Sequence, residues 1–355
     1  MNEFARKIIS WQLRCGRHGL PWQDTRDPYR IWLSEIMLQQ TQVTAVIPFF
    51  ERFLERFPDI AALAQAEESD VMQMWAGLGY YARARNLHRA AKQIVADHQG
   101  RFPEEFDAIH GLPGIGRSTA AAIAAFAFSQ RRAILDGNVK RVFARHFAVG
   151  GDVKSKAVET ALWQLAEQQL PASGIEPYTQ GLMDLGATVC RRSQPSCLLC
   201  PVKTTCVAFK GGRIDELPGK AARRVIPHRE TRMLIVVCRD EVMLERRPPT
   251  GIWGGLWSLP EMPVEQAIDE CLFQRYQLEV RSMRDLPRVD HGFTHYTLTI
   301  FPVVIEVEFA GFRAMEPGAA WVGMADAHRS GVPAPVKRIL AALASAGNDL
   351  QAIKC

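Results

Sequence analysis

Two patterns of hydrophobic and polar positions divide the chain. Up to about residue 208, apolar residues recur every three or four positions, as they do on helices that bury one apolar face. This pattern predicts an all-helical domain. Further on, short apolar runs indicate strands at 233–238, 242–244 and 298–309, with helices at 264–276 and 336–346. We therefore expect a multidomain protein with a helical domain over 1–210, a linker over 211–228 and an α/β domain over 229–355.

Composition and charge narrow the class of protein. Of the 355 residues, 47% are hydrophobic and 23% are charged, which is ordinary for a globular protein and unlike a disordered chain. The longest apolar run, 120–128, is too short to span a bilayer, and the N-terminus has no signal-peptide pattern, so we expect a cytoplasmic protein with no membrane partner. A net charge of +5 permits a nucleic-acid partner without requiring one.

The linker is the most basic stretch. Residues 203–232 carry eight basic and three acidic side chains together with several glycines and prolines. Many basic linkers are merely solvated, but beside a DNA-binding domain such a charge can follow a phosphate backbone.

A carboxylate lies on a largely apolar face of the helix around residues 32–40. Three and four positions from Glu35 stand Ile31, Trp32, Leu38 and Gln39. Burial there would raise the pKa of Glu35 and make it a general-acid candidate. A helix-edge glutamate that reaches solvent explains the same spacing equally well.

A second candidate carboxylate follows a glycine-rich turn. Residues 112–116, LPGIG, lead into an apolar helix starting near Arg117; Gly114 and Gly116 let the backbone approach another chain, and free N–H groups at the helix start suit a phosphate. The later segment ILDGNVK places Asp136 before another helix. Asp136 is either a helix cap or a carboxylate held near DNA. Together, Glu35 and Asp136 would be two carboxyl groups in unequal environments, the arrangement that glycosidic cleavage uses.

Four of the eight cysteines are crowded into 17 residues. Cys190, Cys197, Cys200 and Cys206 have a spacing that indicates metal in a reducing compartment rather than a disulfide framework. Zinc is the main alternative to an iron-sulfur cluster, although zinc ribbons usually pair two closely spaced cysteine pairs, and only Cys197 and Cys200 are so spaced here.

Six segments follow one another along the helical part of the chain: LPWQ, WLSEIMLQQTQV, GLGYYARARNLH, LPGIGRSTA, ILDGNVKRV and MDLGATVC. In this order they resemble the MutY family of adenine DNA glycosylases, which belongs to the endonuclease III-like, helix-hairpin-helix superfamily. The resemblance implies an all-α helix-hairpin-helix glycosylase domain, with the hairpin at about 104–128, followed by an α/β Nudix-like domain. It also implies excision of adenine paired with 8-oxoguanine or guanine in double-stranded DNA, as a step of base excision repair.

The resemblance also implies roles for individual residues. Glu35 would protonate the adenine ring, and Asp136, supported by Asn138, would stabilise the oxocarbenium ion or a covalent sugar intermediate. A pocket for the extruded adenine would involve Trp22, Leu38, Ser118 and Gln180. Wedge and backbone contacts with DNA would come from Gln40, Tyr80, Gly114, Gly116 and Lys140. Without the resemblance, Gln40 is equally a helix-surface amide, Tyr80 a core aromatic and Lys140 a solvated charge.

One position bears on the type of reaction. Related endonuclease III-like lyases carry, where this chain has Ser118, a lysine that forms a Schiff base with the abasic sugar. We therefore expect a glycosylase without efficient lyase activity. Lys140 is the amine nearest to Asp136 in the sequence.

The cysteine spacing resembles the cluster loop at 190–206 of the endonuclease III and MutY families, and this implies one 4Fe-4S cluster. We expect it to be structural, holding Arg191 and Arg192 towards phosphates. We also expect a monomer.

The segment GIWGGLWSLP at 251–260 resembles the Nudix hydrolase family and the last domain of MutY proteins. The places of the Nudix metal-binding glutamates fall here among Phe273, Gln274 and Arg275, so we expect the fold to be kept and the hydrolysis to be lost. Residues Phe293, Thr294 and His295 match the loop with which MutY proteins approach 8-oxoguanine; otherwise they are a turn at a strand edge.

Three other functions compete with an adenine glycosylase. A bifunctional lyase acting on pyrimidine lesions is disfavoured by Ser118 and by the extra C-terminal domain. A Nudix pyrophosphatase would lack its metal ligands. A non-enzymatic iron-sulfur DNA-binding protein would have no need of Glu35 together with Asp136.

Overall fold

The computed structural model describes residues 2–219, 225–248, 250–293, 295–309, 318–327 and 330–346. Contacts between Cα atoms divide the chain into two compact units, Met1–Gln65 with Asn86–Arg223 and Ala66–Arg85 with Arg224–Cys355. The short stretch Ala66–Arg85 thus groups with the C-terminal part, although its sequence pattern is helical. The domain boundaries predicted at 210 and 229 stay a prediction.

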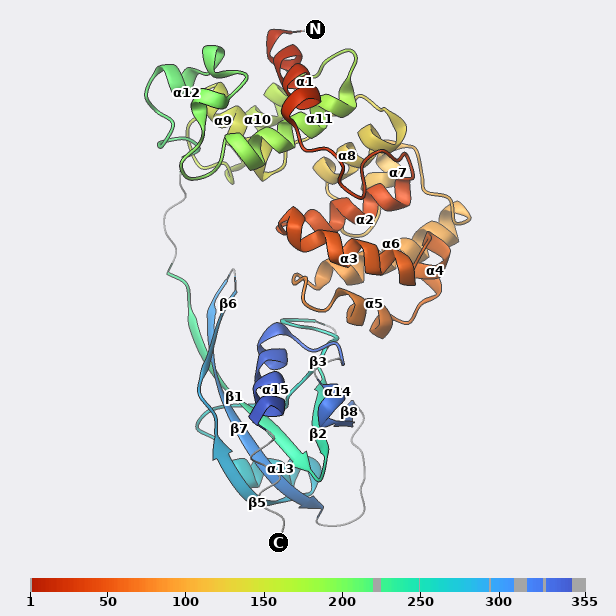
Figure 1. Ribbon diagram of the computed structural model, residues 1–355, viewed down its shortest axis with the longest axis vertical. Helices are drawn as coiled ribbons and strands as arrows, with labels where there is room; N and C mark the ends of the chain where they lie inside the picture. The colour runs from red at the N-terminus through yellow and green to blue at the C-terminus, as the bar shows by residue number, and fades with distance from the viewer. Residues whose placement is uncertain are drawn as a thin grey trace. The chain divides into compact units, whose positions relative to one another are not determined.

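Helices make up all regular structure from residue 3 to residue 210, as predicted (Figure 1). They are α1 (Glu3–Cys15), α2 (Pro28–Leu38), α3 (Val43–Arg56), α4 (Ile60–Gln65), α5 (Glu68–Trp75), α6 (Ala82–His98), α7 (Phe106–His110), α8 (Arg117–Phe128), α9 (Gly137–His146), α10 (Lys156–Gln168), α11 (Ile175–Asp184), the π-helix η1 (Leu185–Val189), the 3-10 helices η2 (Cys197–Leu199) and η3 (Lys203–Thr205), and α12 (Val207–Lys210). Within the described ranges, no helix is both long and apolar enough to cross a membrane.

The helix α8 is the buried centre of the helical unit. Its residues 120–125 are all buried, because α8 contacts α2, α7 and α11 on different sides. Alanine occupies five of these six positions, and its small side chain lets the neighbouring helices come close to the α8 backbone. The residues that flank α8, including the turn before it and the segment leading to Asp136, are therefore held firmly.

The turn between α7 and α8 has the predicted hairpin form. Gly114 has a φ of +80°, and a Cβ atom built there would lie 2.7 Å from the Cβ atom of Asn86. Only glycine satisfies both conditions. The helix α8 begins at Arg117, with Gly116 at its N-cap, as the sequence predicts.

The first residues after α12 pack onto the helical unit. Leu217 is buried in a small cluster with Cys206 and Ala208, and its carbonyl oxygen accepts a hydrogen bond of 2.8 Å from Arg145 Nε. Part of the segment expected to be a linker therefore contributes to the helical core.

In the C-terminal unit, the described part of residues 224–355 forms a mixed sheet with three helices, in addition to α5 from the earlier stretch. The strands are β1 (His228–Cys238), β2 (Glu241–Arg246), β3 (Trp257–Ser258), β4 (Glu261–Met262), β5 (Leu278–Asp285), β6 (Val289–Gly292), β7 (Thr297–Phe309) and β8 (Ala319–Gly323), and the helices are α13 (Ile268–Tyr276), α14 (Met324–Ala327) and α15 (Ala334–Ala346). The sheet order is β3-β2-β1-β7-β5, and the long strands β1 and β7 run parallel at its centre.

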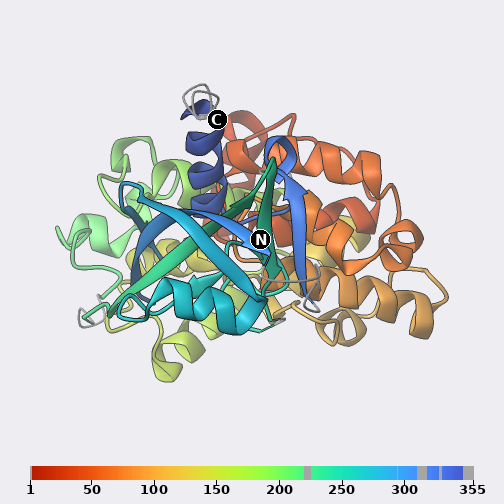
Figure 2. The same ribbon diagram turned by 90° about the horizontal axis from the view of Figure 1, so that it is seen from below.

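The two longest helices of this unit cover opposite faces of the sheet (Figures 1 and 2). On one face, Cys271 and Leu272 of α13 pack against alternate residues of β1 and β7, such as Leu234 and Ile305. The predicted α/β character is confirmed. The prediction that a helix starts at 264 is wrong: α13 begins at Ile268, because the preceding residue adopts an extended conformation.

Candidate active site

A cavity of about 460 Å³ opens in the helical unit. Of the residues predicted to form an adenine pocket or to act in catalysis, Trp22, Glu35 and Gln180 line it together. Leu38 and Ser118, described in the same structure, are not among its lining residues. Ser118 Oγ instead accepts a hydrogen bond of 3.0 Å from the backbone N–H of Leu135, which ties α8 to the segment before Asp136.

The carboxyl group of Glu35 is held in a largely apolar setting. It projects from α2, whose neighbouring residues Ser34 and Ile36 are buried, and it reaches the cavity. Burial raises the pKa of Glu35 to about 7, and the charge of Asp136 raises it further in the same direction. The sequence left open whether Glu35 is buried or reaches solvent at the helix edge, and in the structure its carboxyl group is buried.

Asp136 is both a helix cap and a buried carboxylate. Asp136 is the N-cap of α9, and its Oδ1 accepts a hydrogen bond of 2.7 Å from the N–H of Val139 in the first turn of that helix. Burial raises the pKa of Asp136, while the hydrogen bonds from Val139 and Asn138 and the charge of Arg141 act in the opposite direction. Burial is the largest of these effects, so the pKa of Asp136 is raised overall, and the donors partly offset it by stabilising the carboxylate form.

Asn138 is locked between α9 and η1. Arg141 Nη2 donates hydrogen bonds to Asn138 Oδ1 at 2.8 Å and to the carbonyl oxygen of Gly186 at 2.7 Å. A Cβ atom at Gly186 would lie only 2.5 Å from the Cβ atom of Asn138. A glycine at 186 therefore allows the close approach that holds Asn138 beside Asp136.

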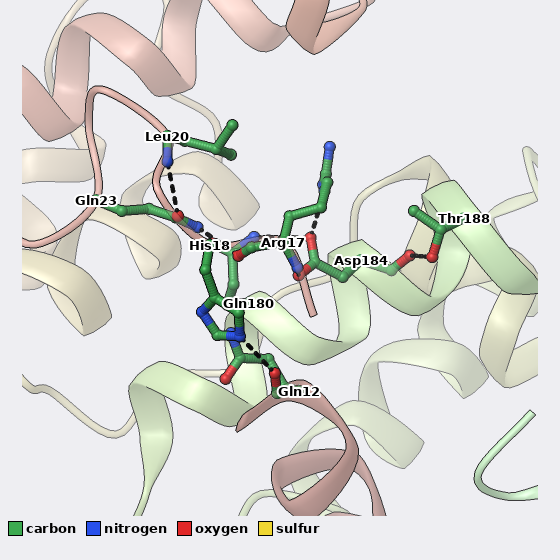
Figure 3. A network of polar contacts seen from close by, with 8 residues as sticks. All are labelled: Gln12, Arg17, His18, Leu20, Gln23, Gln180, Asp184 and Thr188. Carbon is green, nitrogen blue, oxygen red and sulfur yellow. Dashed lines mark hydrogen bonds and ion pairs between the residues drawn. The ribbon is translucent and has the colours of Figure 1, made fainter. Parts of the chain in front are cut away.

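A polar network lies beside the cavity (Figure 3). Gln180 Nε2 donates a hydrogen bond of 2.8 Å to Asp184 Oδ1, and both residues belong to α11. The same carboxylate accepts hydrogen bonds from the backbone N–H of Arg17 at 2.9 Å and from Arg17 Nε at 2.7 Å. The side chain of Asp184 is fully buried, so this residue fixes the segment after α1 against α11.

The four clustered cysteines line one cavity. Burial raises the pKa of Cys200 to about 12, and burial followed by the charges of the other thiolates raises the pKa of Cys197. Thiolates gathered here would repel one another unless a cationic group neutralised them. Among the residues that the structure describes, no three His, Cys, Asp or Glu side chains are grouped closely enough to hold a metal ion.

Residues expected to contact DNA have mixed surroundings. Gln40 and Tyr80 are exposed non-glycine residues with φ of 59° and 50°, conformations that cost energy and are found at turns and functional sites. Lys140 Nζ forms a 2.6 Å ion pair with Glu159.

The segment expected to face 8-oxoguanine lies in the C-terminal unit. The ring of Phe293 packs against Trp253, His291 and Tyr296 at centroid distances of 5.3, 4.6 and 4.7 Å. His295 is exposed, and Thr294 lies outside the described residues. The aromatic side chain thus stands within a cluster of rings.

Comparison with known proteins identifies the family. A model of the HhH-GPD superfamily of base excision DNA repair proteins matches residues 33–168, and a NUDIX domain model matches residues 232–342. Adenine DNA glycosylase from Buchnera aphidicola subsp. Schizaphis graminum is 34% identical over 338 residues, which cover 95% of this chain and 97% of that protein.

The chain belongs to the MutY family of adenine DNA glycosylases. Human adenine DNA glycosylase, also similar, is 31% identical over 405 aligned residues covering 96% of this chain and 73% of the human protein. A thermostable thymine-DNA glycosylase structure has 30% identity and a TM-score of 0.54, over 59% of this chain and 95% of that one. An endonuclease III–DNA complex, at 18% identity and a TM-score of 0.51 over 59% of this chain and 94% of that one, shows the fold.

Membership of the MutY family confirms the predicted helix-hairpin-helix glycosylase domain with a Nudix-like domain after it, and it makes the chain a DNA glycosylase of base excision repair. The sequence patterns did not lead us to Arg17 and Asp184. An aspartate four residues after Gln180 on one helix was a usable signal, whereas the contact with Arg17, 167 positions away, left none in the sequence.

Proposed function

We propose that this MutY-family member hydrolyses the N-glycosidic bond of adenine paired with 8-oxoguanine or guanine in duplex DNA, without efficient lyase activity. The observation that carries the proposal is the carboxyl group of Glu35, which lines a cavity of about 460 Å³ and has its pKa raised to about 7, together with the carboxyl group of Asp136, whose charge contributes to that shift. The names of the relatives support adenine as the base.

In the proposed reaction, Glu35 donates a proton to the adenine ring, so that the base leaves as a neutral molecule. Asp136 carries the negative charge that meets the cationic sugar. Asn138 keeps Asp136 in place through its hydrogen bond. The two carboxyl groups have these separate roles because Glu35 holds its proton near neutral pH, whereas Asp136 is supported by donors.

Adenine must leave the base stack to reach these groups. Trp22 and Gln180, which line the cavity, form part of the proposed pocket. We also assign Leu38 and Ser118 to this pocket, although neither of them lines the cavity. Gln40 and Tyr80 would enter the duplex, as their exposure allows.

The hairpin would hold the DNA backbone. Its turn presents the N–H groups at the start of α8, and Gly114 and Gly116 leave room for a phosphate. Lys140 would add positive charge for a phosphate, but the carboxylate of Glu159, with which it forms an ion pair, offsets part of that charge.

Cys190, Cys197, Cys200 and Cys206 line one cavity and, once deprotonated, would be the ligands of a 4Fe-4S cluster, although the described side chains are not grouped around the position of a single metal ion. A bound cluster would supply the positive charge that offsets the four deprotonated cysteines, which in turn would be held together as its ligands. The chain's own contribution is to fix that loop: Arg145 Nη1 donates a hydrogen bond of 2.7 Å to the carbonyl oxygen of Arg191. This would keep Arg191 and Arg192 available to phosphates.

Recognition of 8-oxoguanine is assigned to the C-terminal unit. Phe293, Thr294 and His295 would approach the lesion, the aromatic ring by stacking and the polar groups by hydrogen bonds. We further propose that the protein acts as a monomer in the cytoplasm, where its DNA is.

The test is incubation of the full chain with a duplex that carries adenine opposite 8-oxoguanine, followed by alkali, which cuts at abasic sites. Strand cutting only after alkali is the expected result. Intact strands, with cutting of a duplex that carries a pyrimidine lesion, would overturn the proposal in favour of the bifunctional lyase.

A further inference from the structure

We infer that Asp184 is a positioning residue that sets which hydrogen-bonding groups the cavity accepts, by fixing the orientation of the Gln180 amide. The inference rests on the proposed function, in which Gln180 contacts the extruded base.

The orientation follows from the chemistry of the partners. A carboxylate paired with a guanidinium has no proton to donate, so every group that contacts it must be a donor. Asp184 accepts from Arg17 Nε, from the Arg17 backbone N–H and from Gln180 Nε2. The amide nitrogen of Gln180 must therefore face Asp184, and its carbonyl oxygen must face away.

Asp184 itself has no freedom to turn. Its side chain is fully buried, and a Cβ atom at Gly16 would lie 3.1 Å from Asp184 Oδ2 and 2.6 Å from the carbonyl oxygen of Gln12. The absence of a side chain at Gly16 lets the segment after α1 pass close to the carboxylate, and Figure 3 shows Arg17 of that segment beside Asp184. Rotation of the Gln180 amide would leave its oxygen against this fixed carboxylate, which is costly in a buried setting.

The free polar atom of Gln180 is thus an acceptor. Gln180 lines the cavity, and in the described part of the chain no donor pairs with its Oε1. An acceptor suits a purine that carries an amino group at position 6, such as adenine. It opposes a purine with an oxo group there, such as hypoxanthine, because two acceptors would meet.

The experiment compares excision of adenine and of hypoxanthine by the full chain. Single-turnover rates are measured for matched duplexes with each base opposite 8-oxoguanine, for the wild type and for Gln180→Met, Asp184→Asn and Thr188→Val. Thr188 Oγ1 donates to the backbone oxygen of Asp184 at 2.8 Å, so Thr188→Val removes a contact of the same residue and spares its carboxylate. The ratio of the two rates is the readout, since a loss of folded protein lowers both rates alike.

We expect the adenine-to-hypoxanthine ratio to fall about tenfold in Asp184→Asn and in Gln180→Met, and to stay at the wild-type value in Thr188→Val. A folded Asp184→Asn protein with the wild-type ratio overturns the inference. If thermal melting shows that Asp184→Asn does not fold, the comparison of wild type with Gln180→Met decides.

In that comparison, a Gln180→Met protein with a higher ratio than the wild type means that the amide nitrogen faces the cavity, and an unchanged ratio means that Gln180 does not contact the base. Either result overturns the inference while adenine excision by the wild type leaves the proposed function standing. A wild-type chain that excises neither base overturns both.

Discussion

Glu35 has surroundings that keep its proton near neutral pH. Burial is the larger cause of its raised pKa and the charge of Asp136 is the smaller one. Because the pKa is raised to about 7, Glu35 is mostly protonated below that pH and loses its proton as the pH rises through it.

The first prediction concerns this proton. Single-turnover excision should be fastest below pH 7 and fall as the pH rises above it. Below pH 7, Glu35→Gln should lower the rate by about 10²–10⁴-fold or more, because an amide of nearly equal size cannot donate the proton, and the difference from the wild type should shrink as the pH rises above 7. Duplex binding measured in parallel should be retained. Near wild-type rates in Glu35→Gln would rule out the acid role.

The second prediction concerns the reaction type. Lys140 Nζ is paired with Glu159, and a paired ammonium group is a poor nucleophile. Borohydride should therefore trap little covalent complex between the protein and an abasic duplex, and Lys140→Ala should trap no less than the wild type. Efficient trapping that Lys140→Ala abolishes would show a lyase with Lys140 as its amine.

At the scale of elements, the site depends on how closely α9 and η1 approach. Gly186→Ala, the third prediction, places a methyl group within 3.0 Å of the Asn138 backbone, so one element must move. We expect a loss of stability of about 1–3 kcal/mol and a strong loss of excision. Gly150→Ala is the matched control, since nothing lies within 4 Å of its added Cβ. Equal excision by both variants would show that the close approach is not needed.

The fourth prediction concerns the loop from Cys190 to Cys206. Protein made with sufficient iron should be yellow-brown and contain about four irons per chain. Cys197→Ser should lower the iron content and the affinity for DNA, whereas Cys15→Ser, a change at an exposed cysteine, should alter neither. Stoichiometric zinc without iron would identify a zinc site instead.

An element can be predicted from the sequence when its buried apolar residues are numerous enough to form a regular pattern. The helices were predictable because their buried faces repeat at helical spacing, and β1 and β7 because the second half of β1 and most of β7 are apolar. The pattern missed β5, most of whose residues are exposed, and β3 and β4, which have two residues each. Likewise, spacing on α2 left a buried and a solvent-reaching Glu35 equally open, and both the choice between them and the contacts of Asp184 with Arg17 depend on tertiary packing.

For the whole molecule, two units with separate cores suggest a division of labour. The cavity and both carboxyl groups lie in the unit formed by Met1–Gln65 and Asn86–Arg223, and Phe293 lies in the other. An enzyme that removes an undamaged base must sense the opposite base separately, because adenine opposite thymine has to be spared. A second unit with its own aromatic cluster is suited to that task.

The last prediction tests this division by shortening the chain. The end point matters, because Leu217 is buried against Cys206 and Ala208 and accepts a hydrogen bond from Arg145. A chain ending at Gly219 keeps these contacts and should excise adenine opposite guanine, yet lose much of its preference for 8-oxoguanine. A chain ending at Gly211 should in addition melt at a lower temperature, since it exposes the apolar surface that Leu217 covers.

In the full chain, Phe293→Ala should lower the preference for 8-oxoguanine without changing the melting temperature of the helical unit. If the chain ending at Gly219 and Phe293→Ala both keep the full preference, the lesion is recognised by the helical unit, and the C-terminal unit has another role.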